Sequence, residues 1–227
     1  MHPYEPIFSF NIGSLILDIK PEAIVQLKIV LCIGILAWYV TRDLKIKPEG
    51  KRQVIVEYIY NMIQNVVDAN MGEQYRDVIP FIGTLATFIL VMNLMGLTGL
   101  PVPTKNFSVT IALGLIAFVF IQAYTIRKIG LKHYFTGYSK PMAMMLPINV
   151  MERVMLPISL SLRLFGNILA ATFLVELVYE ALSGLNWFAQ LIIPVPLHAY
   201  FDIFDGGIQM VIFVMLTMIN LKITVEH

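Results

Sequence analysis

Hydrophobic residues occur in five runs that are each long enough for a helix to cross a lipid bilayer, which takes about 20 apolar residues. Between the first two runs, apolar residues recur at helical spacing with polar residues between them, which is typical of an amphipathic helix on the membrane surface. We therefore predict an all-α polytopic membrane protein with a single membrane domain over residues 1–227. Its expected parts are an external segment over 1–22, transmembrane helices over 23–41, 78–100, 107–126, 145–182 and 187–223, and a surface helix over 53–69.

The last two hydrophobic runs are longer than one bilayer crossing requires. Residues 154–182 and 187–221 contain 29 and 35 residues. As helices they would measure roughly 43 and 52 Å, against a hydrocarbon thickness of about 30 Å. We expect both helices to be strongly tilted or kinked, with an early break or bend at Pro194 and Pro196. The short segment 183–186 allows only a tight turn between them, so they should be antiparallel neighbours.

The distribution of basic residues predicts the orientation in the membrane. Residues 42–52 carry five basic residues, and the loop over 127–140 is again rich in Lys and Arg. Cytoplasmic loops are enriched in Lys and Arg, so both segments should be cytoplasmic and the N-terminus external. The segment 100–106 between them contains two prolines and is expected to form an external turn. The C-terminus is then cytoplasmic.

Composition agrees with a membrane protein and excludes several functions. The chain is 58% hydrophobic and 14% charged, with a mean hydropathy of +0.76, whereas soluble domains are about 45–50% apolar and about 25% charged. Its 16 basic and 15 acidic residues nearly cancel, which argues against nucleic-acid binding. The single cysteine, Cys32, cannot form an intrachain disulfide or a thiolate metal site. We expect neither a metal nor a cofactor.

Arg163 is the strongest functional candidate, because it is the only charged residue in the apolar segment 154–175. Inserting an arginine at the centre of a transmembrane helix costs about 2.5–3.5 kcal/mol. Arginine cannot lose its proton in a protein, so the charge must face a partner or water. Ser159, Asn167 and Ala170 share its helix face and Gly166 lies beside it, which gives a surface that a large partner can approach closely.

Two other groups of polar residues occur in the last two predicted helices. Thr172 and Glu176 lie on a different face of the Arg163 helix. In the final helix, polar residues at spacings of four, three and four should fall within about 60° of one another. These residues are His198, Asp202, Asp205 and Gln209. An ionised acid in hydrocarbon is costly unless it is hydrated, shares a proton or is paired, so both groups are candidates for an ion pathway.

Less specific interpretations stay open at this point. One such interpretation makes Arg163 a structural partner of one of these acids, and another makes His198, near Pro196, a residue of the membrane interface. For Glu152 and Arg153, an interfacial ion pair is the simpler interpretation. One His with two Asp on one helix is a poor match to any metal-ligand set.

Two segments resemble subunit a of the F-type ATP synthase. They are PISLSLRLFGN over 157–167 and the last helix, with GIQ over 207–209 and FVMLTM over 213–218. The order of the predicted elements is similar as well. The resemblance implies a non-catalytic membrane subunit in which Arg163 faces a ring of c subunits and separates two offset aqueous half-channels. It also implies peripheral-stalk b subunits as partners and an indirect link to the catalytic F1 head. The first residues do not look like a cleavable signal, which favours a bacterial plasma membrane as the location.

Members of this family often carry an acid nine residues after the arginine and a polar or ionisable residue seven before the glutamine. Those positions hold Thr172 and Asp202 here, and Asn167 and Gln209 match polar positions near the arginine. We expect Glu176 to take over the carboxylate role of the outer half-channel, with Asp202 opposite. Ion flow would then drive ring rotation and ATP synthesis, with H⁺ or Na⁺ as the coupling ion. The rivals are a secondary ion transporter that works without a rotor and a purely structural anchor subunit.

Overall fold

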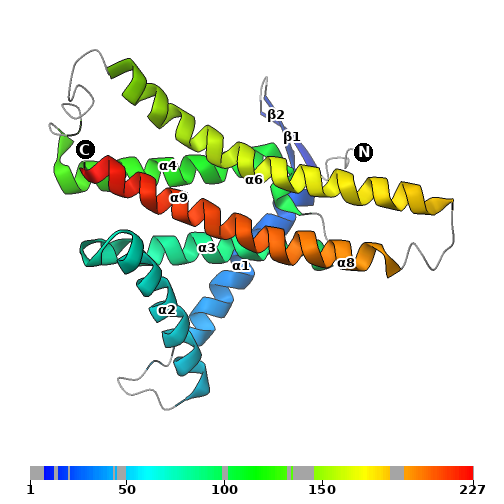
Figure 1. The fold of residues 1–227 in the computed structure, drawn as a ribbon, viewed down its shortest axis with the longest axis horizontal. Coiled ribbons are helices and arrows are strands. Elements are labelled where there is room, and N and C mark those ends of the chain that lie inside the picture. Colours follow the sequence, from blue (N-terminus) through cyan, green and yellow to red (C-terminus); the bar gives the residue numbers. More distant parts are fainter. Residues whose placement is uncertain are drawn as a thin grey trace.

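The protein is a bundle of long helices with short helical turns between them (Figure 1). The computed structural model describes residues 8–12, 15–19, 21–42, 44, 50–98, 102–131, 134, 146–184 and 192–226. The α-helices are α1 (Pro21–Thr41), α2 (Lys51–Asn70), α3 (Ile79–Leu94), α4 (Phe107–Ile129), α6 (Leu146–Ser183), α8 (Pro194–Ala199) and α9 (Gly206–Glu226). The 3₁₀ turns are η1 (Glu73–Val78), η2 (Met95–Thr98) and η3 (Pro103–Lys105), and η5 (Tyr200–Asp205) is a π-helix.

Among the described residues, five helical segments are long and apolar enough to cross a membrane, which confirms the predicted fold class. They are Ala23–Thr41, Glu73–Thr98, Phe107–Ile129, Pro147–Leu182 and Pro194–Glu226. The amphipathic helix forms as α2 and is not among them. Parts of the predicted spans at 99–100, 145 and 187–191, and most of the two basic loops, lie outside the described residues.

A small antiparallel hairpin precedes α1, which the sequence did not lead us to expect in the segment 1–22. Its strands are β1 (Phe8–Ile12) and β2 (Leu15–Ile19), with Phe8 opposite Ile19. The first strand, FSFNI, alternates between apolar and polar residues, which is a strand signal that sequence reasoning could have used. The hairpin adds to the all-α membrane domain and leaves the number of predicted spans unchanged.

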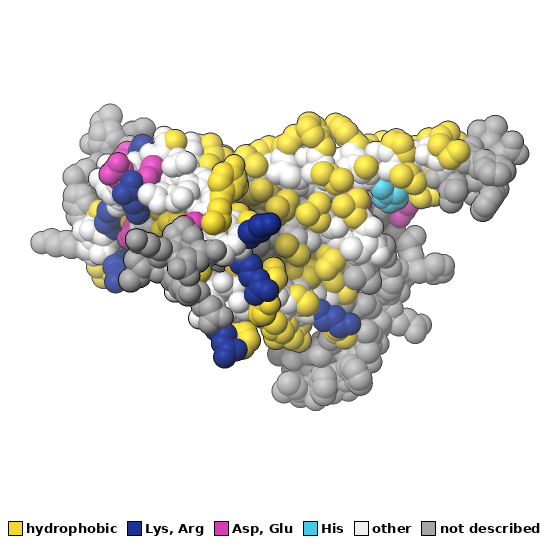
Figure 2. Space-filling view, turned by 90° about the horizontal axis from the view of Figure 1, so that it is seen from below, with side chains coloured by type: hydrophobic (Ala, Val, Ile, Leu, Met, Phe, Trp, Pro, Cys, Tyr) yellow, Lys and Arg dark blue, Asp and Glu magenta, His cyan; other side chains and the backbone are white. Residues whose placement is uncertain are grey.

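The helices α3, α4 and α9 pack together and contain most of the buried side chains. One hydrophobic cluster includes Tyr75, Ile121 and Met218, and a second includes Met92 and Phe213. By contrast, α1 is exposed along most of its length, and Ile29 is the one fully buried side chain over its described residues 23–41. Hydrophobic side chains cover much of the face in Figure 2, and a group of charged side chains lies at its left end. An apolar exterior of this kind suits contact with lipid.

Helix α6 lies close against α4 on one side only. Its buried residues Pro157, Leu160, Ser161 and Leu164 form the face toward α4. At Gly114 of α4, an added side chain would collide with the Ser161 hydroxyl and the Pro157 carbonyl. Because the two backbones approach this closely, the orientation of α6 about its axis is fixed. The opposite face of α6 is therefore directed away from α4.

Candidate functional site

Arg163 lies on the outward face of α6. It is exposed, as are Ser159, Gly166 and Ala170, while Asn167 is half-buried. We call the exposed residues Ser159, Arg163, Gly166 and Ala170 the Arg163 face. These are residues that helical spacing groups together, and the packing of α6 against α4 leaves them uncovered by the described chain. A partner can therefore approach the guanidinium closely.

The described part of the chain provides no acidic partner for Arg163. The ion pairs among these residues join Arg76 to Asp68 and Glu73, and His198 to Asp202. An internal salt bridge to the acids of α6 or η5 is therefore not formed in the described chain. A cation at this depth still requires a counter-charge or water.

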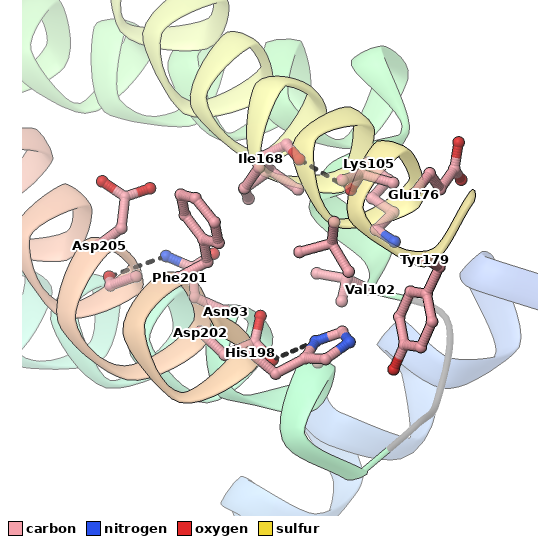
Figure 3. Close-up of a pocket in the computed structure, with 15 residues that line it drawn as sticks. Asn93, Val102, Lys105, Ile168, Glu176, Tyr179, His198, Phe201, Asp202 and Asp205 are labelled. Atoms are coloured by element: carbon pink, nitrogen blue, oxygen red, sulfur yellow. Dashed lines mark hydrogen bonds and ion pairs between the residues drawn. The ribbon is translucent and has the colours of Figure 1, made fainter. Parts of the chain in front are cut away.

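A cavity of about 310 Å³ lies at the end of the bundle where α6, η5 and η3 meet (Figure 3). It brings together most of the other predicted site residues, from α6 and from the helical segment that follows it in the chain, α8 with η5. These are Thr172, Glu176, His198, Asp202 and Asp205. We call this space the acid cavity. Arg163, Asn167 and Gln209 do not line it, so the candidate residues divide between two places.

His198 and Asp202 form the closest charged pair in the acid cavity. The His198 Nδ1 and Asp202 Oδ2 atoms are 3.6 Å apart, which is within range of electrostatic attraction but too long for a hydrogen bond. The Asp202 Oδ2 atom is buried and has no hydrogen-bond partner among the described residues. The Tyr179 ring of α6 lies 6.2 Å from the His198 ring. The Asp202 carboxylate thus has an oxygen atom that can still accept a hydrogen bond, and it lies beside the His198 imidazole, which can bind and release a proton.

The π-helix η5 changes the predicted line of polar residues on the last helix. Pro194 and Pro196 lie in the first turn of α8, where the missing N–H groups cost little. The chain then passes through the π-helix, whose wider turns change the direction of the residues that follow. Asp202 and Asp205 both line the cavity, whereas Gln209 is buried in the packed face of α9. The predicted line therefore ends at Asp205.

Residues from α3 and η3 complete the acid cavity and were not predicted. The Asn93 side-chain amide donates to the Gly206 carbonyl at 3.1 Å, and the Thr104 hydroxyl donates to Asn93 Oδ1 at 3.4 Å. Asn93 and Lys105 both line the cavity. Asn93 is a polar residue inside a transmembrane run, which is a signal that sequence reasoning could have used. Lys105 gave no such signal, because a Lys near the end of a span is ordinary.

Gly96 keeps the Asp202 carboxylate against the wall of the acid cavity. A Cβ at this position would lie 2.5 Å from Asp202 Oδ1, so Gly96→Ala should displace the carboxylate end without disturbing the backbone. On the function that the resemblance to subunit a implies, we expect the variant to assemble normally and to lower the rate of coupled ion transport by roughly threefold. Ion pumping and the amount of assembled complex in native membranes measure this. Gly207→Ala is the control, since open space surrounds that position. Equal pumping by the two variants would contradict the importance of the carboxylate position.

Taken together, the fold and these two places define a polytopic membrane protein with ionisable side chains inside its membrane-spanning part. Residues 23–222 match the family described as ATP synthase A chain. The chain belongs to this family, that of subunit a of the ATP synthase.

Three relatives show how far the similarity extends. ATP synthase subunit a 2 of Bradyrhizobium sp. is 33% identical over 215 residues, which cover 94% of this chain and 92% of the relative. The sodium ion specific subunit a of Propionigenium modestum is 31% identical over 198 residues, which cover 80% of this chain and 66% of the relative. Subunit a of Listeria welshimeri is 32% identical over an alignment of 233 positions, which covers 96% of this chain and 94% of the relative. The chain is therefore a multi-pass membrane protein that associates with other subunits of an ATP synthase.

Proposed function

We propose that this chain is the non-catalytic, ion-conducting stator subunit of a rotary ATP synthase. In this proposal, two offset half-channels lead ions to and from carboxylates on a ring of c subunits, and Arg163 separates the two paths. The observation that carries the proposal is the position of Arg163, exposed on the outward face of α6 and without an acidic partner among the described residues. Arg163 does not line the acid cavity, so in this proposal the arginine acts on the ring while the acids of the cavity conduct ions.

Electrostatics explains what the Arg163 face does to a passing carboxylate. Two opposite unit charges about 4 Å apart attract by roughly 4 kcal/mol at an effective dielectric of 20. A ring carboxylate beside the guanidinium is therefore favoured in its charged form and releases its ion. The same cation repels any ion that crosses directly between the half-channels. Transit then requires rotation of the ring, and each charge driven by 100 mV supplies about 2.3 kcal/mol.

The acid cavity is the proposed outer half-channel, with Glu176 on α6 and Asp202 on η5 as its main acids. The Thr172 hydroxyl donates to the Ile168 carbonyl at 2.8 Å, so this side chain is occupied within its own helix. Glu176 lies one turn further on and lines the same cavity, which supports it as the replacement carboxylate. His198 and Asp205 extend the path. Asn167 and Gln209 are proposed to act near the arginine.

The orientation of the chain is part of the proposal. Figure 1 shows the C-terminus at the end of the bundle opposite to α8. If the C-terminus is cytoplasmic, as the basic loops predict, the acid cavity lies in the outer half of the membrane. The N-terminus is then external, and the proposed membrane is the bacterial plasma membrane. The partners are the c ring and the peripheral-stalk b subunits, with F1 reached indirectly.

Cysteine crosslinking tests whether the Arg163 face meets the ring. In the intact complex with Cys32→Ser, we expect Ala170→Cys to form an oxidative crosslink to cysteines placed along the outer helix of the c subunit, because Ala170 is exposed beside Arg163. Val119→Cys, on the exposed side of α4, is the control and should not crosslink. Electrophoresis under non-reducing conditions measures the product. A crosslink from Val119 but not from Ala170 would place the ring against the wrong helix and contradict the proposal.

A further inference from the structure

Lys105 introduces a positive charge into the acid cavity. It is the last residue of η3 and lines the cavity together with Glu176 and Asp202. Figure 3 shows its side chain reaching into this space from the side of Glu176 and Tyr179. The remaining titratable groups that line the cavity are Tyr179, His198 and Asp205. The described lining thus contains carboxylates from α6 and η5, one ammonium and one imidazole.

The backbone around Lys105 is held firmly to the framework that carries the acids. Thr104 is fully buried and donates to Asn93, and Asn93 in turn donates to the carbonyl of Gly206, the residue directly after η5. On the other side, Asn106 caps α4 by accepting a hydrogen bond from the Ser108 N–H. The backbone of Lys105 is therefore placed relative to Asp202 by a short chain of contacts. It does not lie on a long, independent loop.

Several carboxylates in one small cavity need compensating charge. Without it, each acid either keeps its proton or attracts a mobile cation from solution. A fixed ammonium in the same space supplies one positive charge permanently. A mobile metal cation then gains less by entering, while the carboxylates can still exchange protons with one another and with His198.

We propose that Lys105 is the built-in counter-ion of the acid cavity, which keeps its carboxylates available to protons without a bound alkali-metal cation. This inference rests on the proposed function, and it names H⁺ as the ion that the outer half-channel accepts. Lys105 is thus a positioning and selectivity residue of the pathway. It acts on the acids, and it does not itself carry the ion.

The test measures how ATP synthesis depends on the outer pH and on Na⁺. Reconstituted vesicles with the catalytic head outside have the outer half-channel facing the lumen, so lumenal pH and Na⁺ are varied at fixed membrane potential. For Lys105→Gln without Na⁺, we expect the lumenal pH of half-maximal synthesis to rise by about 1 unit, because the acids lose a positive neighbour. Adding about 100 mM Na⁺ should move it back toward the wild-type value, since Na⁺ then competes with protons.

Three proteins serve as controls. Wild type should show a half-maximal pH that is independent of Na⁺, Lys105→Arg should behave like wild type, and Lys51→Gln, which removes the same charge from the exposed start of α2, should have no effect. A Lys105→Gln profile identical to that of wild type would overturn the role of Lys105. Wild-type synthesis that requires Na⁺ would overturn H⁺ as the accepted ion. Both results leave the stator function intact, whereas wild-type vesicles with no ion-driven synthesis would refute the stator function itself.

Discussion

Replacing Arg163 by Ala should abolish ATP synthesis and ATP-driven ion pumping while the complex still assembles. The attraction of roughly 4 kcal/mol between the guanidinium and a ring carboxylate corresponds to a factor on the order of 10³ in the equilibrium between charged and neutral carboxylate. Without it, the carboxylate keeps its ion as it passes α6, and rotation transports nothing. Assembly should survive, because Arg163 is exposed and is not used as an ion-pair partner by the described chain.

Membranes that contain the intact complex allow the measurement. ATP-driven acidification and ATP synthesis report coupling, and passive ion uptake after removal of F1 should reveal a leak between the half-channels. Arg127→Ala, an exposed arginine in the last turn of α4, is the control and should remain coupled. Normal pumping by Arg163→Ala would refute the assignment. A failure of assembly would favour the anchor subunit, and transport that persists without the c ring would favour the secondary transporter.

Replacing Glu176 by Gln should lower ATP synthesis by about tenfold or more, because the outer path loses a group that accepts and releases protons. The double variant Thr172→Glu with Glu176→Gln should recover most of the rate, since both side chains line the same cavity one turn apart on α6. The rate of synthesis at a fixed ion-motive force in reconstituted vesicles measures both effects.

Glu180→Gln is the matched control for this pair. Glu180 lies one further turn along α6, is exposed and does not line the acid cavity, so its replacement should leave the rate nearly unchanged. An unchanged rate in Glu176→Gln would remove this residue from the pathway. A double variant that is as slow as the single one would show that the carboxylate has to stand at Glu176.

Hydrophobic patterning predicted the fold class because transmembrane helices depend on local composition. Each of the five spans is an apolar run whose backbone groups must be satisfied within the segment itself. The Arg163 face was also predictable, because a straight helix fixes the angles between Ser159, Arg163 and Ala170. The roles assigned to these residues stay predictions until the variants are measured.

The acid cavity depends on packing and was only partly predictable. Glu176, His198 and Asp202 were identified by their cost in an apolar segment, but the angles after Asp205 changed because η5 is a π-helix. The other wall, with Asn93 and Lys105, is assembled by hydrogen bonds between α3, η3 and α9. Contacts between segments that are this far apart in the chain, such as Asn93 and Gly206, produce no periodic pattern of hydrophobic and polar residues.

The close approach of α4 and α6 at Gly114 has a mechanical consequence for a stator. In the proposed function, a turning ring pulls sideways on the helix that carries Arg163, so this helix must not roll or bend under the load. Gly114 lets the backbone of α4 rest directly against α6 on the side opposite to Arg163. Since α4 in turn packs on α9, the torque is passed into the most tightly packed part of the subunit and does not accumulate as motion of α6.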